Sequence, residues 1–305
     1  MIVYRELASI ERELGFPAKT LYGISNSLDR HYRKVTLPKK NGGTRSLSVP
    51  DEILKRIQRA IAEKLLSYRP VSRFATAYKP AASVKKNACR HVGKKKLVKL
   101  DILHFFDSIL YSTVKDKVFP CEIFSEKIRI LLSMLCYYRD ALPQGAPTSP
   151  FISNIILFDF DERVGAFCHE RGITYTRYCD DMTFSGDFDE AEVIAFVEEE
   201  LRTRGFFLNR NKTAVIPKAK QQKVTGLVVN DGVAVARSYR RALRQEIYYL
   251  EKFGVQAHLE RIASPLSPEK YLNSLFGKLS FVLSVTPNDR EALALKQKLL
   301  ALTGE

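Results

Sequence analysis

YCDD, residues Tyr178 to Asp181, separates two predicted β-strands that span residues 172–177 and 182–185. The two adjacent carboxylates repel each other, and a strand-to-strand turn needs neither of them. The pair suits a divalent cation, because carboxylate oxygens bind Mg²⁺ and substrate phosphates complete its coordination shell. A solvated acidic turn is the simpler alternative. A third carboxylate and a nucleic-acid surface elsewhere in the chain would favour the cation site.

The composition of the chain indicates a polyanionic partner. Its 305 residues carry 49 Lys and Arg against 34 Asp and Glu, which gives a formal net charge of +15. Such an excess favours nucleic acid, because each neutralised phosphate releases condensed counterions. No apolar run approaches the ~20 residues that a membrane-spanning helix needs, and the N-terminus lacks the pattern of a signal peptide. We therefore expect nucleic acid, and no membrane, as the partner.

The cysteines and the hydrophobic content limit the class of fold. Five cysteines are scattered without a CxxC pair, which argues against a disulfide framework and against a zinc site. We expect reduced, half-buried thiols in a cytosolic protein. With 45% hydrophobic residues, the chain can bury a core and is long enough for two or three subdomains.

The hydrophobic pattern predicts a mixed α+β fold. Residues 97–230 alternate between strand-like and helix-like patterns, which indicates a sheet with helices on one face. Before them, two short strands flank a basic turn at residues 39–45. From Arg237 onward the pattern is helical, with Leu243, Ile247 and Leu250 under a basic face. The other predicted helices span residues 4–14, 50–66, 150–168 and 190–204, the last closed by Gly205.

Asp101 provides a third carboxylate. It closes an alternating hydrophobic strand at residues 97–102, and the strand end would deliver it toward the YCDD turn. Three carboxylates can hold two cations about 3.5–4 Å apart, which activate an attacking hydroxyl and stabilise a leaving pyrophosphate. The alternative is that Asp101 caps a helix beginning near Leu103. The presence of YCDD in the same chain favours the metal site.

A rigid loop lies between these acids in the sequence. Residues 142–150 read LPQGAPTSP, in which Thr148 or Ser149 can cap a helix and Pro150 suits its first turn. Gly145 would allow the backbone to approach a ligand closely, and the Gln144 amide can hydrogen-bond a base or sugar edge. An ordinary proline-rich lead-in to a helix is the alternative, but the full string favours a ligand site.

Several strings of the sequence resemble family motifs. LDILHFFD at residues 100–107, LPQGAPTSP at 142–150 and YCDD, in this order and spacing, resemble motifs A, B and C of reverse transcriptases. NACRH at residues 87–91 fits the NAxxH pattern, and VTG at residues 224–226 fits the VTG pattern, of retron reverse transcriptases. The resemblance covers nearly the whole chain. It departs from the family at the second residue of YCDD, where alanine is more usual and variation is common.

Two other hypotheses stay open beside a retron reverse transcriptase. A stand-alone group II intron-like or diversity-generating reverse transcriptase is disfavoured by NAxxH, by VTG and by the lack of room for a maturase-like extension. A catalytically idle RNA-binding scaffold is disfavoured because it would have no reason to keep three mutually repelling acids.

The resemblance implies the right-hand polymerase fold. This is an α+β architecture whose palm is an antiparallel sheet with helices on one face. Residues 1–96, with part of 115–142, would form the fingers. Residues 97–230 would form the palm with motifs A to D, and residues 231–305 a short helical thumb.

The resemblance also implies roles for the residues of these motifs. Asp101, Asp180 and Asp181 would be catalytic and would hold two Mg²⁺ ions, with Mn²⁺ as an alternative and Asp180 as the more direct ligand of the adjacent pair. Phe106 would be the steric gate that excludes a ribonucleotide 2′-OH, unless it is simply a core residue beside Phe105. The other predicted contacts with the incoming nucleotide are Gln144, Gly145, Arg45 on the triphosphate and Lys212 near the leaving pyrophosphate.

A second set of residues would contact RNA or the template–primer duplex. Asn87 and His91 would serve RNA recognition or the architecture of the fingers, and we assign no chemical step to His91. Val224, Thr225 and Gly226 would form a strand edge on the nucleic acid, unless they form a simple turn. Four arginines would form a thumb face that holds an RNA–DNA duplex by its backbone: Arg237, Arg240, Arg241 and Arg244.

The family resemblance implies an RNA-directed DNA polymerase that uses deoxynucleoside triphosphates. Its template and primer would be a cognate structured non-coding RNA. Synthesis would start from the 2′-OH of an internal guanosine and give a branched RNA–DNA hybrid, msDNA. The resemblance further implies a bacterial cytoplasmic setting and a role in anti-phage defence with a separate effector protein, which rests on family analogy alone.

Overall fold

The YCDD turn belongs to a four-stranded sheet with the strand order β4-β5-β3-β6. Its strands are β4 (Thr174–Tyr178), β5 (Asp181–Gly186), β3 (Lys96–Asp101) and β6 (Ala214–Pro217). β3 and β4 both run antiparallel to β5, and Leu100 and Met182 are buried in the core between them and the helices. The strands predicted at residues 97–102, 172–177 and 182–185 are confirmed to within two residues.

The register of this sheet brings the carboxylates to one end. Asp101 lies opposite Asp181 across β3 and β5, and Tyr178 lies opposite Asp181 across β4 and β5. Cys179 and Asp180 therefore form the two-residue turn of a β-hairpin. A slip of one residue in either pairing would move one carboxylate to the other face of the sheet.

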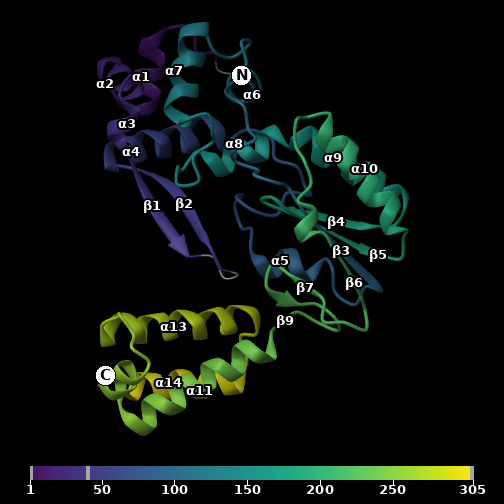
Figure 1. Ribbon diagram of the computed structural model, residues 1–305. Coiled ribbons are helices and arrows are strands. Elements are labelled where there is room, and N and C mark those ends of the chain that lie inside the picture. The colour runs from purple at the N-terminus through teal and green to yellow at the C-terminus, as the bar shows by residue number, and fades with distance from the viewer. Residues whose placement is uncertain (1–2, 39–41, 303–305) are drawn as a thin grey trace. The chain divides into compact units, whose positions relative to one another are not determined.

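The chain divides into two units (Figure 1). The structure is a computed structural model and describes residues 3–38 and 42–302. Unit 1 consists of Met1–Ala82 and Lys96–Val215, and unit 2 consists of Ser83–Lys95 and Ile216–Glu305. The fold is mixed α+β, as predicted. These units do not coincide with the expected fingers, palm and thumb, because residues 83–95 belong with the C-terminal part of the chain, and the three-part division stays a prediction.

Two helices of unit 1, α9 (Phe158–Glu170) and α10 (Glu190–Arg202), lie over one face of the sheet (Figure 1). The prediction of a single helix over residues 150–168 is wrong, because α8 (Ser149–Ile156) ends just before α9 begins. At Leu157 the backbone leaves helical geometry, with φ −90° and ψ 8°. Ser153 favours the bend, because its hydroxyl donates to the Pro150 carbonyl at 2.8 Å. Gly205, at φ +78°, closes the turns that follow α10, as predicted.

The remaining helices of unit 1 share one hydrophobic core with the sheet. They are α1 (Leu7–Leu14), α2 (Ala18–Ser25), α3 (Leu28–His31), α4 (Glu52–Ile61), α6 (Tyr111–Thr113) and α7 (Glu126–Cys136), and π-helical turns extend α4 over Ala62–Leu66 and α6 over Val114–Val118. The helices predicted at residues 4–14 and 50–66 are thus confirmed with later starts.

An antiparallel hairpin extends from this helical layer (Figure 1). It consists of β1 (Tyr32–Pro38) and β2 (Thr44–Pro50). The two strands predicted on either side of the basic turn are confirmed. Residues 39–41 of the turn itself lie outside the described residues.

Unit 2 combines a small antiparallel sheet with longer helices. The sheet has the order β7-β8-β9, formed by Lys223–Val224, Leu227–Val228 and Ala234–Val235, and α5 (Val84–Cys89) packs against β7 and β8. The C-terminal helices are α11 (Arg237–Phe253), α12 (Val255–Arg261), α13 (Pro268–Val285) and α14 (Arg290–Ala301). Leu243, Ile247 and Leu250 are buried on α11, as the pattern predicted.

Within residues 3–38 and 42–302, no helix is both long enough and apolar enough to cross a membrane. The five cysteines are free thiols. Cys136, Cys168 and Cys179 are buried, whereas Cys89 and Cys121 are exposed.

The loop at residues 142–150 packs closely on β2. A Cβ atom added at Gly145 would lie 2.5 Å from the Ser48 carbonyl oxygen. Glycine at this position therefore allows two backbone segments of the protein to approach each other, whereas the sequence suggested a ligand as the partner. The Ser149 hydroxyl donates to the Pro143 carbonyl at 2.6 Å and closes the loop. Neither Thr148 nor Ser149 caps α8 with its side chain, so that prediction is wrong.

We predict that Gly145→Ala destabilises unit 1 by about 1–3 kcal/mol, because the new methyl group overlaps backbone that cannot rotate away. Gly23→Ala in α2 is the matched control, since no atom lies within 4 Å of its added Cβ and alanine favours a helix. Thermal unfolding followed by circular dichroism should give a lower Tm for Gly145→Ala and an equal or higher Tm for Gly23→Ala. A Gly145→Ala protein as stable as the parent would contradict the close contact with Ser48.

Candidate active site

The three predicted acids line one cavity of unit 1, with a volume of about 650 Å³. Asp101 comes from the end of β3, and Asp180 and Asp181 come from the hairpin of β4 and β5. Side chains from several other segments complete the lining: Thr44 and Ser46 of β2, Tyr78, residues 102–107, Gln144, Asn209 and Lys212. The structure thus brings together residues that are far apart in the sequence.

The backbone of the YCDD turn is strained at its first central residue. Cys179 has φ +61°, in the left-handed region that L-residues rarely adopt and that glycine or asparagine usually occupies in such turns. Tyr78, which lines the cavity beside Cys179, is itself at φ +57°. Burial and then the charge of Asp180 raise the pKa of the Cys179 thiol to about 12, so the thiol is protonated at neutral pH. Such strain persists only where surrounding contacts enforce it.

Asp101 is the most enclosed of the three acids, with 3% of its surface exposed. The Asn209 amide donates to its Oδ1 at 3.0 Å, and Lys212 Nζ donates to its Oδ2 at 2.8 Å. The Asn209 backbone N–H also donates to the Asp101 carbonyl at 2.7 Å, which holds the 3₁₀ turn η3 (Arg210–Lys212) beside β3. Residues 103–108 form turns and no helix begins at Leu103, so the alternative of Asp101 as a helix cap is wrong.

Like charges are concentrated around Asp181. Burial raises the pKa of this carboxyl and so do the charges of Asp180 and Asp101, while the charges of Lys99 and Lys212 oppose the rise. The surrounding protein removes part of the hydration of this carboxylate, but the residue still reaches solvent, which screens part of the repulsion. The pKa of Lys212 is raised in turn, because its hydrogen bond with Asp101 and the nearby acids outweigh the effect of burial. Lys212 is therefore a cation that partly neutralises the acids.

The donor set suits divalent cations in its chemistry. The three carboxylates offer hard oxygen ligands, and the pKa of Asp181 is raised by burial first and then by the charges of Asp180 and Asp101, which a cation would offset. Across the described residues, however, no three His, Cys, Asp or Glu side chains are gathered closely enough to hold a metal ion. Both oxygens of Asp101 are engaged by Asn209 and Lys212. A cation at Asp101 therefore requires Lys212 to release Oδ2.

Several of the residues predicted to contact the incoming nucleotide line the cavity with the acids. Phe106 and Gln144 both line the cavity. Phe106 is half-buried and its ring lies 5.2 Å from that of Phe105, so it belongs to the cavity wall and to the edge of the core at once. The side chain of Arg45 lies outside the described residues, although its neighbours Thr44 and Ser46 line the cavity.

The two strings typical of retrons meet inside unit 2. Asn87 and His91 are buried at α5 and just after it, and Val224 is buried in β7. Burial, then the charges of Arg90 and Lys94, lowers the pKa of His91 to about 3, so its ring is neutral at physiological pH. These three buried side chains serve the architecture of unit 2. Their burial favours the architectural alternative for Asn87 and His91, and contact of these segments with RNA stays a prediction.

Thr225 and Gly226 form the turn between β7 and β8. Their φ angles are +46° and +87°, so the simple-turn alternative describes them correctly. The Thr225 hydroxyl donates to the Val84 carbonyl at 3.0 Å and holds the turn against the start of α5. Contact of this turn with RNA stays a prediction.

The arginines predicted for the thumb face fall into two groups. Arg240 donates to Asp289 at 2.9 Å and to Glu291 at 2.8 Å, and Arg244 pairs with Glu291 at 3.1 Å. These two arginines attach α11 to the start of α14. Arg237 and Arg241 are exposed. Phosphate binding by Arg240 or Arg244 would compete with an ion pair inside the protein, whereas Arg237 and Arg241 are accessible, and contact of all four with nucleic acid stays a prediction.

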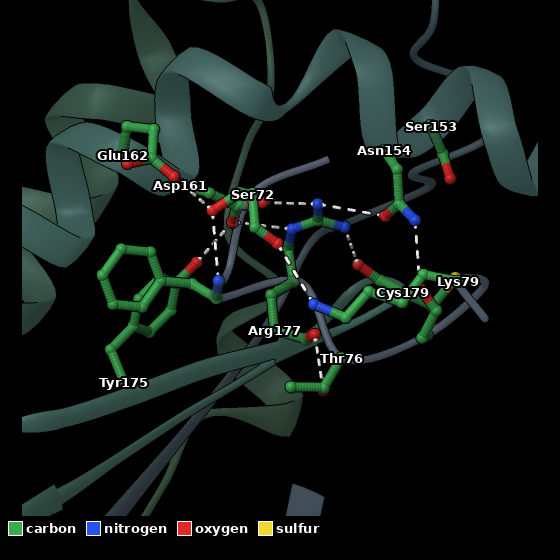
Figure 2. Close-up of polar contacts among 12 residues, drawn as sticks. Ser72, Thr76, Lys79, Ser153, Asn154, Asp161, Glu162, Tyr175, Arg177 and Cys179 are labelled. Atoms are coloured by element: carbon green, nitrogen blue, oxygen red, sulfur yellow. Dashed lines mark hydrogen bonds and ion pairs between the residues drawn. The ribbon is translucent and has the colours of Figure 1, made fainter. Parts of the chain in front are cut away.

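Sequence reasoning missed three residues that shape the site. Arg177 donates to the Cys179 carbonyl from the strand just before the turn (Figure 2), Asn209 holds Asp101, and Tyr78 lines the cavity beside Cys179. A signal for Arg177 was present, because a charged residue inside an otherwise buried strand needs a buried partner. No comparable pattern marked Tyr78.

Comparisons with known proteins identify the family of the chain. The chain matches the family model "Reverse transcriptase (RNA-dependent DNA polymerase)" over residues 37–229, a span that contains all three acids. It is 33% identical to the retron Mx65 reverse transcriptase of Myxococcus xanthus, over 97% of this chain and 72% of that protein. It is 28% identical to the retron Ec86 reverse transcriptase of Escherichia coli, over 95% of this chain and 88% of that protein. The chain therefore belongs to the reverse transcriptase family and is a retron-type RNA-directed DNA polymerase.

Proposed function

We propose that the chain copies a cognate structured non-coding RNA that serves as both template and primer. Synthesis would start from the 2′-OH of an internal guanosine and give the branched RNA–DNA hybrid msDNA. The observation that carries the proposal is the cavity in which Asp101, Asp180 and Asp181 lie with Phe106 and Gln144. The similarity to retron reverse transcriptases supports the assignment to this class of polymerase, and the RNA-primed start is what the family resemblance implies.

Asp101, Asp180 and Asp181 would be the catalytic acids and would hold two Mg²⁺ ions, or Mn²⁺ in their place. When bound, such ions activate the primer hydroxyl and stabilise the charge on the leaving pyrophosphate. The contribution of the protein is to bring the three carboxylates to one cavity, and Asp180 would be the more direct ligand of the adjacent pair. Lys212 donates to Asp101 at 2.8 Å, and once released from Asp101 its ammonium group would approach the pyrophosphate.

The walls of the cavity would select and orient the nucleotide. Phe106 would exclude a ribonucleotide by contact with its 2′-OH, and the Gln144 amide would hydrogen-bond the base or the sugar. Arg45 would grip the triphosphate through paired hydrogen bonds. Gly145 would act through its close approach to β2, which sets the position of Gln144 beside the strand.

We infer that these elements form a right-hand polymerase. Residues 1–96 with part of 115–142 would be the fingers, residues 97–230 the palm, and residues 231–305 the thumb. The sheet with the acids at one end and α9 and α10 on one face supports the palm. The helices α11 to α14, which begin with the accessible Arg237 and Arg241, support a thumb that contacts a duplex backbone.

The biological setting follows from family analogy alone. The partners would be the cognate RNA, its RNA–DNA product, deoxynucleoside triphosphates and a separate effector protein. The chain would work in the bacterial cytoplasm as part of an anti-phage defence system. The net charge of +15 supports the nucleic-acid partners.

Co-expression with the flanking transcript tests the proposed function. With Mg²⁺ and deoxynucleotides, the chain should yield branched single-stranded DNA that is attached to RNA and sensitive to RNase. Asp180→Asn/Asp181→Asn should lower the yield by at least about 10³-fold, because the cation ligands are lost. DNA made only from an annealed primer would indicate another class of reverse transcriptase. RNA binding without any synthesis would indicate a scaffold.

We predict that Asp181→Asn stabilises the fold at pH 7 and raises Tm by about 1–3 °C. The pKa of Asp181 is raised above its usual 3.8 in the folded state, so its ionised form opposes folding at neutral pH. The difference should shrink as the pH falls through the raised pKa and vanish below 3.8, where both states bind the proton. Asp29→Asn is the control of opposite sign, because hydrogen bonds from Tyr138 and Arg139 lower the pKa of Asp29. A Tm that falls in Asp181→Asn at pH 7 would contradict the repulsion described here.

We predict that Phe106→Val admits ribonucleotides, because the smaller side chain leaves space for the 2′-OH. The ratio of kcat/KM for a deoxynucleotide to that for the matching ribonucleotide should fall by at least about 10-fold. Phe105→Leu, which alters the adjacent but buried ring, should keep the ratio. A ratio unchanged in Phe106→Val would leave Phe106 as a residue of the core edge only.

A further inference from the structure

A buried arginine contacts the strained turn. Arg177 lies two residues before Cys179, and its Nη1 donates to the Cys179 carbonyl at 2.9 Å (Figure 2). This carbonyl belongs to the peptide that joins Cys179 to Asp180. The hydrogen bond therefore limits the orientation of the peptide plane from which Asp180 begins. With Cys179 at φ +61°, the turn needs such a contact, because the conformation is unfavourable for an L-residue.

Two helices fix the orientation of Arg177. Asp161 of α9 accepts from Nε at 2.8 Å and from Nη2 at 2.6 Å, and Asn154 of α8 accepts from Nη2 at 3.3 Å. The Tyr175 hydroxyl donates to Asp161 Oδ1 at 2.8 Å. A guanidinium is a planar fork with fixed donor directions. Once Nε and Nη2 are engaged, Nη1 is aimed at the Cys179 carbonyl.

The same network holds the segment beside the turn. The Asn154 amide donates to the Ala77 carbonyl at 3.0 Å, directly before Tyr78, which lines the cavity together with Cys179. The Thr76 hydroxyl donates to the Arg177 carbonyl at 2.9 Å. Side chain and backbone of Arg177 thus both connect the turn to its surroundings.

The burial of the Arg177–Asp161 pair argues for a role beyond stability. Both side chains are completely buried, and taking two charges out of water costs so much that apolar residues would stabilise such a site at least as well. Arg129 provides a comparison within unit 1. It is also buried and pairs with Asp116 and Glu126, but its backbone partners, Phe119 and Lys115, lie outside the cavity lining. Arg177 differs in that its backbone partner belongs to the YCDD turn.

We propose that Arg177, oriented by Asp161 and Asn154, is the positioning residue for Asp180. It holds the Cys179–Asp180 turn in the conformation that presents the Asp180 carboxylate to the cations. This inference rests on the proposed function of the three acids. Arg177 is not a catalytic residue, because the protein encloses it completely.

Arg177→Lys and Arg129→Lys form the matched pair that tests this role. Lysine keeps the charge beside Asp161 but lacks the fork that reaches Cys179 at the same time. We expect Arg177→Lys to weaken Mn²⁺ binding, followed by the electron paramagnetic resonance signal of free Mn²⁺, by at least about 10-fold. Its kcat should fall by a similar factor, while KM for the deoxynucleotide should stay within about 3-fold. Arg129→Lys should lower Tm without changing Mn²⁺ affinity. Equal Mn²⁺ affinity in the two variants would overturn the inference.

A rescue experiment tests whether the backbone transmits the effect. In the Arg177→Lys background, Cys179→Gly should recover Mn²⁺ affinity several-fold, because glycine adopts a positive φ without strain. Cys179→Ala removes the thiol but keeps the Cβ and should not recover it. Recovery by alanine as large as by glycine would exclude strain at residue 179 as the link.

Two further results distinguish a failure of this inference from a failure of the variant to fold and from a failure of the proposed function. If Arg177→Lys does not fold, Asn154→Ala decides, since the Arg177–Asp161 pair remains in it. A loss of Mn²⁺ affinity of about 3-fold or more supports the inference, and an unchanged affinity overturns it. If the parent protein itself neither binds Mn²⁺ nor polymerises, the proposed function fails. If the parent does both and Arg177→Lys matches Arg129→Lys, the role of Arg177 alone fails.

Discussion

The buried ion pair between Arg177 and Asp161 connects the packing of the helices to the position of the YCDD turn. Water reaches neither side chain. The backbone of Arg177 is held as well, since its N–H donates to Phe74 at 2.9 Å and its carbonyl accepts from the Thr76 N–H at 2.7 Å. These bonds cover the edge of β4 that would otherwise be open. A close-packed interior does not deform gradually. The placement of the acids therefore follows from the core of unit 1, although the acids themselves lie at the cavity.

The site places three acidic side chains in one cavity, although the stability of the fold does not require them there. Desolvation of Asp181, together with repulsion from Asp180 and Asp101, raises the free energy of the folded state, as the raised pKa of Asp181 reflects. Lys212 and Asn209 reduce this cost by holding Asp101. The arrangement is reasonable for an enzyme that uses cations, because the repulsion that weakens the free protein strengthens cation binding. It also gives Lys212 two possible partners, an acid of the site and the leaving group.

Local patterns in the sequence predicted most helices and strands and most residues of the candidate site. The features that the sequence did not predict depend on tertiary contacts. A strand that ends in Asp101 and a turn that reads YCDD are visible in the sequence because period-two hydrophobicity and turn chemistry are local. The break between α8 and α9 at Leu157 was not visible in the sequence, because the bend depends on a side-chain hydrogen bond inside α8. Gly145 indicated that its backbone approaches another group closely, but the sequence did not identify that group. The partner is Ser48, which lies nearly a hundred residues away in the chain. His91 fitted a family pattern, and only the fold shows it to be enclosed.

Anomalous diffraction from crystals soaked in Mn²⁺ tests most directly whether the buried pair presents the acids to cations. We predict a manganese peak at the carboxylates of Asp101 and Asp180, with Lys212 Nζ withdrawn from Asp101 and the Cys179 carbonyl still bonded to Arg177. Manganese bound elsewhere, or at these acids with the Arg177–Cys179 hydrogen bond broken, would contradict it.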